Sequence, residues 1–365
     1  MNETLGIRAY EKINYNYDTE NRDLLNKLDT LLKLSNKLSS PLLDRLKPSI
    51  LLSIKWKFDF LAKTLKSPFD LSNDIEYWIG ILKMLLDLNN QSWFNTSDLS
   101  NNEDVWARTK HAFNFMWPRT TSESHSVSAY NISKEMVSLR LKQIIDLIEG
   151  REKFIENSII IDSGCGPGRY TDVLSEYNPH KIIGIDSGKD IITENRKRFS
   201  KNHNIEMIHG FCDNLPLEDN STDLVISAGV LHHLPDPMEK LIVEHARVIK
   251  ENGYLFIFIA GKGGLELKIW EFMREFLKGI PINKLHKYFD GTVNPLRLQG
   301  LLDHGYGEYQ QTDRTELEKW LKNHFREIKR VPGIEGLDVT EEIYANDIYF
   351  PYRFGTGNLR YLCRK

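Results

Sequence analysis

Apolar residues recur at helical spacing through the first quarter of the chain. From residue 20 to about 92, leucines and other apolar residues stand three and four positions apart. This spacing places one apolar stripe on each helix. Pro41, Pro48 and Pro68 stand between the stripes and predict the breaks. The pattern therefore predicts several amphipathic helices, followed by a polar linker over 89–103.

A different pattern begins near residue 157, where short β-branched runs alternate with helical stretches. The runs are 158–162, 181–186, 205–209, 223–227 and 254–259, with two later strand candidates at 326–331 and 358–364. Near-continuous apolar strands between helices are typical of a parallel sheet covered on both faces. The pattern predicts an α/β, doubly wound fold.

We expect the chain to have three parts. They are an N-terminal helical domain over 1–110, an aromatic bridge and helix over 111–150, and an α/β domain over 151–365. The helix of the bridge is expected over 133–148, with Ser133 as its N-cap. The α/β domain carries a helix-rich insertion at 261–325, which opens with three glycines in four residues. A glycine-rich start of this kind is compatible with the hinge of a lid or with a flexible loop.

Composition narrows the class of protein. The 365 residues are 41% apolar with a formal net charge of −3, so no global positive field favours nucleic acid. Three cysteines, Cys165, Cys212 and Cys363, are too few for a disulfide framework or a zinc site, which indicates a reducing compartment and no metal. The N-terminus is polar, without the apolar core of a signal peptide, and the most continuous apolar stretch, around 254–260, is far short of a membrane span. We expect a soluble, cytoplasmic protein.

The first β run ends in a glycine-rich turn. Glycines stand at 164, 166 and 168, just after Asp162. A strand that feeds such a turn and then a helix suits a nucleotide cofactor, because glycine lets the backbone turn tightly and approach a ligand. The spacing is G-x-G-x-G, unlike the G-x-G-x-x-G of dinucleotide sites, which seat a pyrophosphate. An acidic residue here suits a cationic ligand without phosphate, such as S-adenosylmethionine (SAM). For the motif alone, a tight turn without a ligand is the equal alternative.

Two further carboxylates follow later strand runs. Asp186 ends the second run and can accept both hydrogen bonds of a ribose diol. Asp213 follows the third and can accept from the exocyclic amine of adenine. Because the carboxyl ends of parallel strands meet at one edge of a sheet, we expect Asp162, Asp186 and Asp213 to converge on one crevice. Each alone fits a helix cap or turn, but three at successive strand ends favour a binding site.

Four segments, taken in order, resemble the motifs of class I SAM-dependent methyltransferases. They are IIIDSGCGPGRY, IIGIDSG, GFCDNLPLEDNSTDLVISAGVLHHLPDP and HARVIKENGYLFI, within about residues 155–260. Within this class, the motifs most resemble those of the "type 11" and ubiquinone/menaquinone-biosynthesis methyltransferases. The resemblance implies a Rossmann-like, seven-stranded sheet with an antiparallel last strand. It also implies SAM as the cofactor and S-adenosylhomocysteine (SAH) as its product.

The resemblance implies cofactor contacts for residues at the strand ends. Ordered from the methionine part of SAM through its ribose and adenine to the active-site side, they are Asp162, Gly164, Gly166 and Gly168, then Asp186, then Cys212 and Asp213, then Ser227 and His233. The resemblance fades before about residue 110 and after residue 262. Such enzymes set substrate identity in those regions, so the substrate class does not transfer.

Two histidines follow the fourth strand run at the mouth of the expected site. Methyl transfer from a sulfonium requires in-line positioning, and a general base helps only with some acceptors. An unperturbed histidine titrates near pH 6.5, so His232 or His233 suits the role of a base. The alternative is that both pack the loop and help to position SAM.

Two other segments are candidates for contacts. In the aromatic stretch over 113–119, Trp117 suits a sulfonium and Arg119 suits the SAM carboxylate. The alternative for this stretch is a hinge packed between domains. Candidate substrate contacts in the insertion are polar and aromatic residues, namely Arg297, His304, Tyr306 and Tyr309.

The leading interpretation is a methyltransferase that acts on a small-molecule metabolite at O, N, S or C. The alternatives are an RNA or protein methyltransferase that docks through its N-terminal helices, and a SAM-binding protein without catalysis. The Asn-Pro-Pro-aromatic motif of base methylation is absent after the fourth run, where Ser227-Ala-Gly-Val stands, and this argues against N6-adenine targets. The N-terminal helices could form a homodimer interface, wall the pocket or bind a partner protein.

Overall fold

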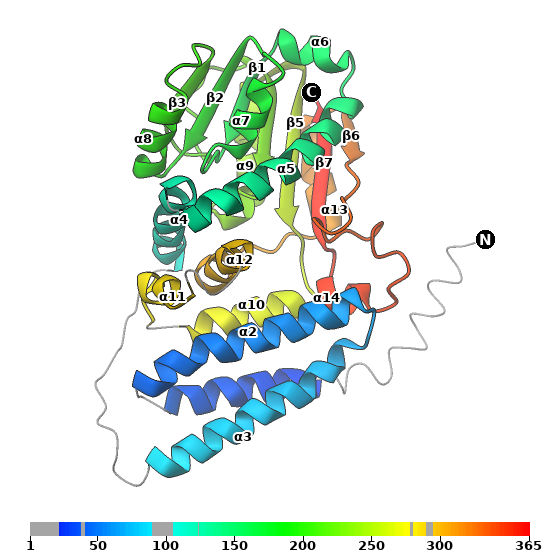
Figure 1. Cartoon of the computed structure of the whole chain (residues 1–365). Helices are drawn as coiled ribbons and strands as arrows, with labels where there is room; N and C mark the ends of the chain where they lie inside the picture. The colour runs from blue at the N-terminus through cyan, green and yellow to red at the C-terminus, as the bar shows by residue number, and fades with distance from the viewer. Residues whose placement is uncertain (1–21, 38–40, 90–104, 123, 278–279, 290–294) are drawn as a thin grey trace, which may run out of the picture. The chain divides into compact units, whose positions relative to one another are not determined.

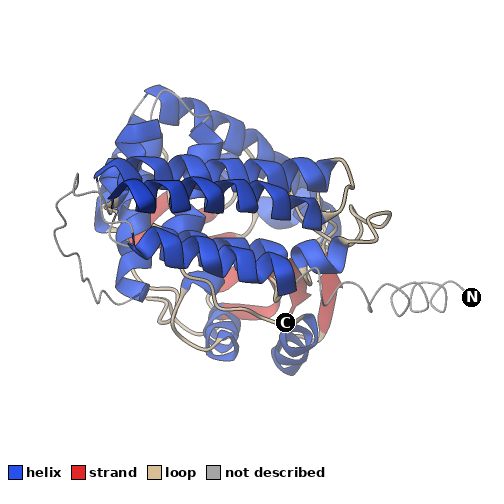
Figure 2. Cartoon of the chain, turned by 90° about the horizontal axis from the view of Figure 1, so that it is seen from below, coloured by secondary structure: helices blue, strands red, loops and turns tan. Residues whose placement is uncertain are grey.

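The structure is a computed structural model that describes residues 22–37, 41–89, 105–122, 124–277, 280–289 and 295–365 (Figure 1). The described residues form two compact units. One comprises those between Met1 and Asn102 together with those of Leu265–Pro281, and the other comprises those of Glu103–Gly264 and Ile282–Lys365. All strands of the β-sheet, drawn red in Figure 2, belong to the second unit.

The sheet of the second unit has seven strands in the order β3-β2-β1-β4-β5-β7-β6. The strands are β1 (Ile159–Ser163), β2 (Lys181–Asp186), β3 (Ile205–His209), β4 (Thr222–Ala228), β5 (Ile249–Ala260), β6 (Glu327–Arg330) and β7 (Asn358–Arg364). Strands β1 to β5 are parallel, and β7 lies antiparallel between β5 and β6. The predicted α/β, doubly wound sheet with an antiparallel last strand is confirmed.

Helices cover both faces of this sheet. Ile160 of β1 packs with α5 (Ser124–Leu147) and α7 (Arg169–Ser175), on the face seen in Figure 1. The next residue, Ile161, packs on the other face with α9 (Met238–Val248) and α13 (Arg314–His324). Side chains alternate because a strand is pleated, and burial on both faces explains the near-continuous apolar runs.

The second unit contains further helices. They are α4 (Val105–Ser122), α6 (Arg151–Glu156), α8 (Lys189–Arg198), the short η2 (Leu231–His233), α11 (Ile282–Phe289), α12 (Pro295–Tyr306) and α14 (Phe350–Phe354). Because α5 begins at Ser124, the prediction of a helix start and cap at Ser133 is wrong. No proline or glycine lies between Ser124 and Ser133 to stop the helix earlier.

The first unit is helical, as predicted. It contains a helix over 22–37, α2 (Pro41–Lys63), the short η1 (Pro68–Asp70), α3 (Leu71–Asn89) and α10 (Leu265–Phe276). The predicted break at Pro48 is wrong, because this proline lies inside α2. A proline costs a helix one hydrogen bond, but the buried stripe through Ile50, Ile54 and Phe58 stabilises α2 around it. Most of the predicted linker lies outside the described residues.

The predicted insertion at 261–325 is divided between the two units. Its first helix, α10, packs beside α2, where the carboxylate of Glu266 is 3.2 Å from Nζ of Lys55. Helices α11, α12 and α13 belong to the second unit. The units also divide at Asn102 and not at residue 110, because α4 packs with α5 and α8. No helix in the described part of the chain is long and apolar enough to cross a membrane.

Candidate active site

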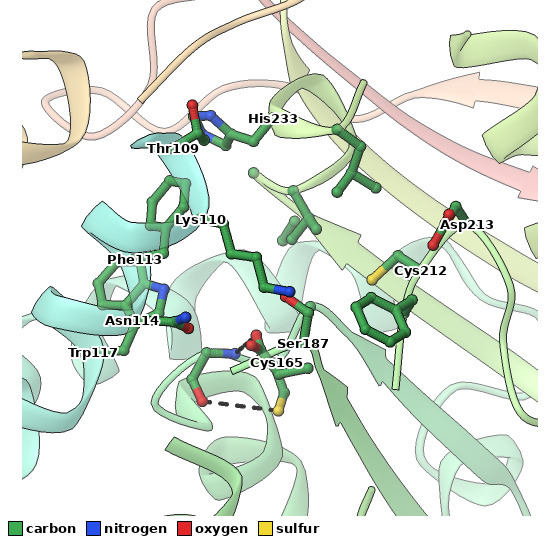
Figure 3. Close-up of a pocket in the computed structure, with 18 of the residues that line it drawn as sticks. Thr109, Lys110, Phe113, Asn114, Trp117, Cys165, Ser187, Cys212, Asp213 and His233 are labelled. Atoms are coloured by element: carbon green, nitrogen blue, oxygen red, sulfur yellow. Dashed lines mark hydrogen bonds between the residues drawn. The ribbon is translucent and has the colours of Figure 1, made fainter. Parts of the chain in front are cut away.

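A cavity of about 420 Å³ opens at the carboxyl ends of β1, β2 and β4 in the second unit (Figure 3). Ligand sites commonly have volumes of this size. Its wall combines the turn after β1, the end of β2, the loops after β3 and β4, and one side of α4. The predicted residues that line it are Trp117, Asp162, Gly164, Gly166, Asp186, Cys212, Asp213 and His233. The carboxylates therefore converge on one crevice.

Other predicted residues do not line the cavity. Gly168 lies at the start of α7, and Ser227 is fully buried within β4. His232 is buried beside the cavity wall. Arg119 lies in α4, but its side chain is outside the described part of the chain.

The turn after β1 requires glycine. The φ angles of Gly164, Gly166 and Gly168 are +72°, +49° and +73°, a region that residues with a β-carbon rarely adopt. A β-carbon on Gly164 would lie 2.4 Å from Cγ1 of Val230. One on Gly166 would lie 3.4 Å from Nε1 of Trp117. The backbone of the turn therefore lies closer to Val230 and Trp117 than a residue with a β-carbon would allow.

Asp162 is a buried carboxylate that lines the cavity. Its Oδ2 accepts hydrogen bonds from the backbone N–H of Thr171 at 3.0 Å and from the Thr171 hydroxyl at 2.8 Å. Burial raises the pKa of Asp162 to about 6, and the bonds from Thr171 oppose this rise only in part. An ionised carboxylate in such a place is stabilised by a nearby cation. The residue therefore fits a cationic ligand.

Asp186 is the last residue of β2, and both of its carboxylate oxygens accept hydrogen bonds from backbone N–H groups. Oδ2 accepts from the N–H of Gly166 at 2.9 Å, and Oδ1 accepts from the N–H of Gly188 at 2.8 Å. Burial raises the pKa of Asp186, whereas these two bonds lower it. Because each oxygen can accept twice, each retains one acceptor site. This arrangement fits a vicinal diol, such as that of a ribose.

One side of α4 forms a further wall. Trp106, Lys110, Phe113 and Trp117 all line the cavity, at helical spacing. Figure 3 shows the last three on the same side of the cavity, and the rings of Phe113 and Trp117 stack at 5.6 Å between centroids. Trp106 and Lys110 were not among the predicted site residues, although the helical period of this segment places them on the same face as Trp117.

The two histidines after β4 differ in environment. Nδ1 of His233 is 2.8 Å from the carbonyl oxygen of Glu308, so this nitrogen carries a hydrogen and donates it. Nε2 of His233 lies 3.8 Å from Oδ1 of Asp303. His232 instead accepts at Nδ1 from the N–H of Ala260, at 3.3 Å. Burial sets the pKa of His232 well below its ordinary value, so His232 is a neutral packing residue.

The predicted substrate residues of the insertion bond mainly to one another, and the Tyr309 ring packs against His232 and His233 of the loop after β4. Tyr309 donates its hydroxyl hydrogen to Asp303 at 3.0 Å, and the same hydroxyl lies 2.6 Å from Nδ1 of His304. Gln310 donates to the carbonyls of Leu234 and Asp236, both at 2.8 Å. His304, Tyr306 and Tyr309 do not line the cavity, and the side chain of Arg297 is outside the described residues.

The two thiols of the cavity wall are buried and neutral. Burial raises the pKa of Cys212 to about 12 and that of Cys165 well above its ordinary value. Only a thiolate is a strong nucleophile, so neither cysteine is placed for covalent chemistry. Within the described ranges, no three His, Cys, Asp or Glu side chains are grouped to hold a metal ion.

Comparison with known proteins agrees with this geometry. Residues 161–257, which run from β1 to β5, match the family described as "Methyltransferase domain". The chain contains a SAM-dependent methyltransferase domain. The match includes the glycine turn, Asp186 and the loops after β3 and β4, and thus most of the cavity wall apart from α4.

Relatives of the methyltransferase domain act on different compounds. The chain is 29% identical over 143 residues to a malonyl-[acyl-carrier protein] O-methyltransferase of Marinomonas sp., covering 39% of this chain and 50% of that protein. It is 33% identical over 97 residues to a demethylmenaquinone methyltransferase of Staphylococcus saprophyticus, covering 26% and 41%. The chain thus spans half or less of the length of these two relatives.

Solved structures of methyltransferases are also similar to this chain. One is the 1,6-didemethyltoxoflavin-N1-methyltransferase of Burkholderia thailandensis, solved with bound 1,6-didemethyltoxoflavin and SAH. It is 16% identical, with a TM-score of 0.39 over 74% of this chain and 93% of that chain.

Proposed function

We propose that this protein binds SAM in the cavity and transfers its methyl group to a small-molecule acceptor. The observation that carries the proposal is the convergence of Asp162, Asp186 and Asp213 on one cavity beside the aromatic side of α4. These groups suit the charges and hydrogen-bonding groups of SAM. The methyltransferase domain and its small-molecule relatives support the same proposal.

The residues of the cavity fit the parts of SAM. Asp162 supplies negative charge for the cationic methionine end, and Asp186 retains acceptor sites for the ribose hydroxyls. Cys212 and Asp213 form the wall where the adenine would lie. The stacked rings of Phe113 and Trp117 place aromatic faces near the glycine turn, where a sulfonium is attracted.

The protein's contribution to the chemistry is mainly positioning. When bound, SAM supplies an electrophilic methyl group and leaves as neutral SAH. Holding the acceptor atom, the methyl carbon and the sulfur in line can contribute several kcal/mol, on the order of 7 or more in well-oriented cases. The glycine turn and α4 both line this volume.

His233 is the residue that we assign to proton transfer, if the acceptor carries a proton. Its Nδ1–H is held by the Glu308 carbonyl, so the lone pair of the neutral ring is on Nε2. A proton taken up at Nε2 would lie near the carboxylate of Asp303, which stabilises the charged ring. His232 is not assigned this role, because it is buried and does not line the cavity.

A transfer experiment with methyl-labelled SAM tests the proposal. The full chain is incubated with labelled SAM and a cell extract, which is then separated into metabolites, protein and RNA. Label in one metabolite peak supports the proposal and provides the mass of the product. Label in protein or RNA, or tight SAM binding without transfer, contradicts the small-molecule assignment.

A matched pair of variants shows whether the cavity carries the activity. Asp186→Ala should reduce transfer at limiting SAM by at least about tenfold, because it removes the acceptors for the ribose. Asp190→Ala should preserve it, since Asp190 is an exposed residue of α8 outside the cavity. Equal activity in both variants would place the reaction elsewhere.

A further inference from the structure

One face of α4 contacts both the glycine turn and the surroundings of His233. Thr109, Phe113 and Trp117 follow one another at intervals of four residues, which places them on the same face of the helix, and all three line the cavity. Figure 3 shows them in a row along α4. At one end of the row, Trp117 lies against Gly166, where an added β-carbon would be 3.4 Å from Nε1 of the indole. The face therefore reaches the turn that we assign to the cofactor.

The other end of the row meets His233. The rings of Phe113 and His233 pack edge to face, with 4.8 Å between their centroids. Thr109 is buried, and its hydroxyl oxygen accepts the backbone N–H of Glu308 at 2.8 Å. The carbonyl oxygen of the same Glu308 accepts the hydrogen on Nδ1 of His233, also at 2.8 Å. The backbone of Glu308 thus joins Thr109 of α4 to His233.

This connection sets which nitrogen of His233 carries the hydrogen. The segment of Glu308 runs beside the loop after β4, where the N–H of Gln310 donates to the carbonyl of His232 at 2.7 Å. With Nδ1 directed at the Glu308 carbonyl, Nε2 lies 3.8 Å from Oδ1 of Asp303. If the carbonyl moved away, the neutral ring could carry its hydrogen on either nitrogen. Only the Nδ1–H tautomer has its lone pair on Nε2.

We propose that Thr109 is a positioning residue that holds His233, through the backbone of Glu308, in the tautomer that accepts a proton at Nε2. Two hydrogen bonds in series carry the effect, and each has the length of a good hydrogen bond. The helix that lines the cofactor cavity therefore also sets the state of the base. This inference rests on the proposed function, because it takes His233 as the group that receives the proton of the acceptor.

Nitrogen-15 NMR of the full chain tests the tautomer of His233 directly. At about pH 9, well above the ordinary titration of histidine, the wild type should show the Nδ1–H form. Thr109→Val keeps the shape of the side chain but removes the acceptor. It should lower the ratio of the Nδ1–H form to the Nε2–H form by roughly two- to tenfold, the equivalent of one hydrogen bond. Thr109→Ala removes the same acceptor and should shift the ratio likewise, whereas Thr109→Ser retains a hydroxyl and should keep the wild-type ratio.

Thr222→Val is the matched control. The hydroxyl of Thr222 is equally buried and donates to the carbonyl of Val248 at 3.1 Å, outside the cavity. This variant should preserve the tautomer of His233. A shift as large as that of Thr109→Val would assign the effect to general packing and overturn the inference. A wild-type His233 in the Nε2–H form, or an unchanged ratio in both Thr109→Val and Thr109→Ala, would overturn it too.

Transfer and affinity separate this role from cofactor binding. With saturating labelled SAM, Thr109→Val should reduce transfer into the metabolite peak by about two- to tenfold, in step with the tautomer ratio. Its calorimetric affinity for SAH should stay within about twofold of the wild-type value, because the bond that it loses supports His233. A loss of SAH affinity as large as the loss of transfer would make Thr109 a cofactor contact, contrary to the inference.

Failure of the inference is distinguishable from failure of the proposed function. If the wild type binds no SAH and transfers no label, the proposed function fails, whereas the tautomer ratios still test the link between Thr109 and His233. If label is transferred and neither the ratios nor the transfer depend on Thr109, only the inference fails.

Discussion

Asp162 and Thr171 are joined by two hydrogen bonds to a single carboxylate oxygen. The backbone N–H and the hydroxyl of Thr171 both donate to Oδ2, at 3.0 and 2.8 Å. The strand β1 thereby holds the start of α7, and the glycine turn lies between them. Two donors do not offset the burial of the carboxylate, whose pKa rises to about 6. The site thus holds a charge that a bound cation would stabilise.

Asp162→Asn should stabilise the ligand-free protein and weaken SAM binding. A carboxyl whose folded pKa is raised contributes stability at low pH and loses it as pH rises through about 6. The variant should therefore match the wild type below about pH 4 and exceed its unfolding free energy by on the order of 1–3 kcal/mol at pH 8. Denaturant unfolding at both pH values measures this. A less stable variant at pH 8 would contradict the assigned cause.

Asp186→Ala should weaken the binding of SAM and SAH alike. The loss of a charge-assisted acceptor for the ribose should cost about 1.5–3 kcal/mol of binding free energy. Calorimetry measures both affinities, and Asp190→Ala should leave them unchanged because that residue is exposed and outside the cavity. Unchanged affinity in Asp186→Ala would show that the ribose does not lie at the end of β2.

Trp117→Leu should weaken SAM binding more than SAH binding. An aromatic face attracts the sulfonium of SAM but not the neutral sulfur of SAH, by about 0.5–2 kcal/mol. Leucine keeps an apolar side chain there, so the ratio of the two affinities isolates the electrostatic part. Trp320→Leu is the control, since Trp320 packs on the apolar cluster of α9 and α13. Equal losses for SAM and SAH would assign Trp117 to packing alone.

Gly164→Ala should destabilise the protein, whereas Gly300→Ala should not. A β-carbon at 164 meets Val230 at 2.4 Å and requires φ of +72°, each of which costs on the order of 1–2 kcal/mol. Position 300 lies inside α12, and nothing stands within 4 Å of an added β-carbon. Alanine there should raise stability by about 0.5–1 kcal/mol. Thermal unfolding of both variants tests this, and similar shifts would contradict the strain at Gly164.

The elements with local signals could be predicted from the sequence. Strand β2 occupies the predicted residues 181–186, because an apolar, β-branched run between polar turns is typical of a buried strand. The carboxylates at 162 and 186 could be placed together because parallel strands end at the same edge of a sheet. The helical face of α4 was available in the same way, although only its aromatic part was recognised.

Other features depended on partners far along the chain. Pro48 predicted a break in α2, but the packing of the apolar residues after it maintains the helix. Helix α10 follows the sheet in sequence but belongs to the first unit, where Glu266 meets Lys55. His304 and Tyr309 were predicted to contact substrate, and they instead form hydrogen bonds around Asp303. No local pattern distinguishes these outcomes.

The sequence by itself determined where the binding residues stand relative to the strands. A glycine turn follows β1, and carboxylates stand at the ends of later strands. These depend on backbone freedom and on the pleat of a parallel sheet, which are local properties. Only the tertiary structure decided the state of each group. The pKa of Asp162 depends on burial and on the Thr171 hydroxyl, and the tautomer of His233 depends on the carbonyl of the distant residue Glu308. Desolvation and hydrogen bonding act through space, and the fold alone brings those partners together.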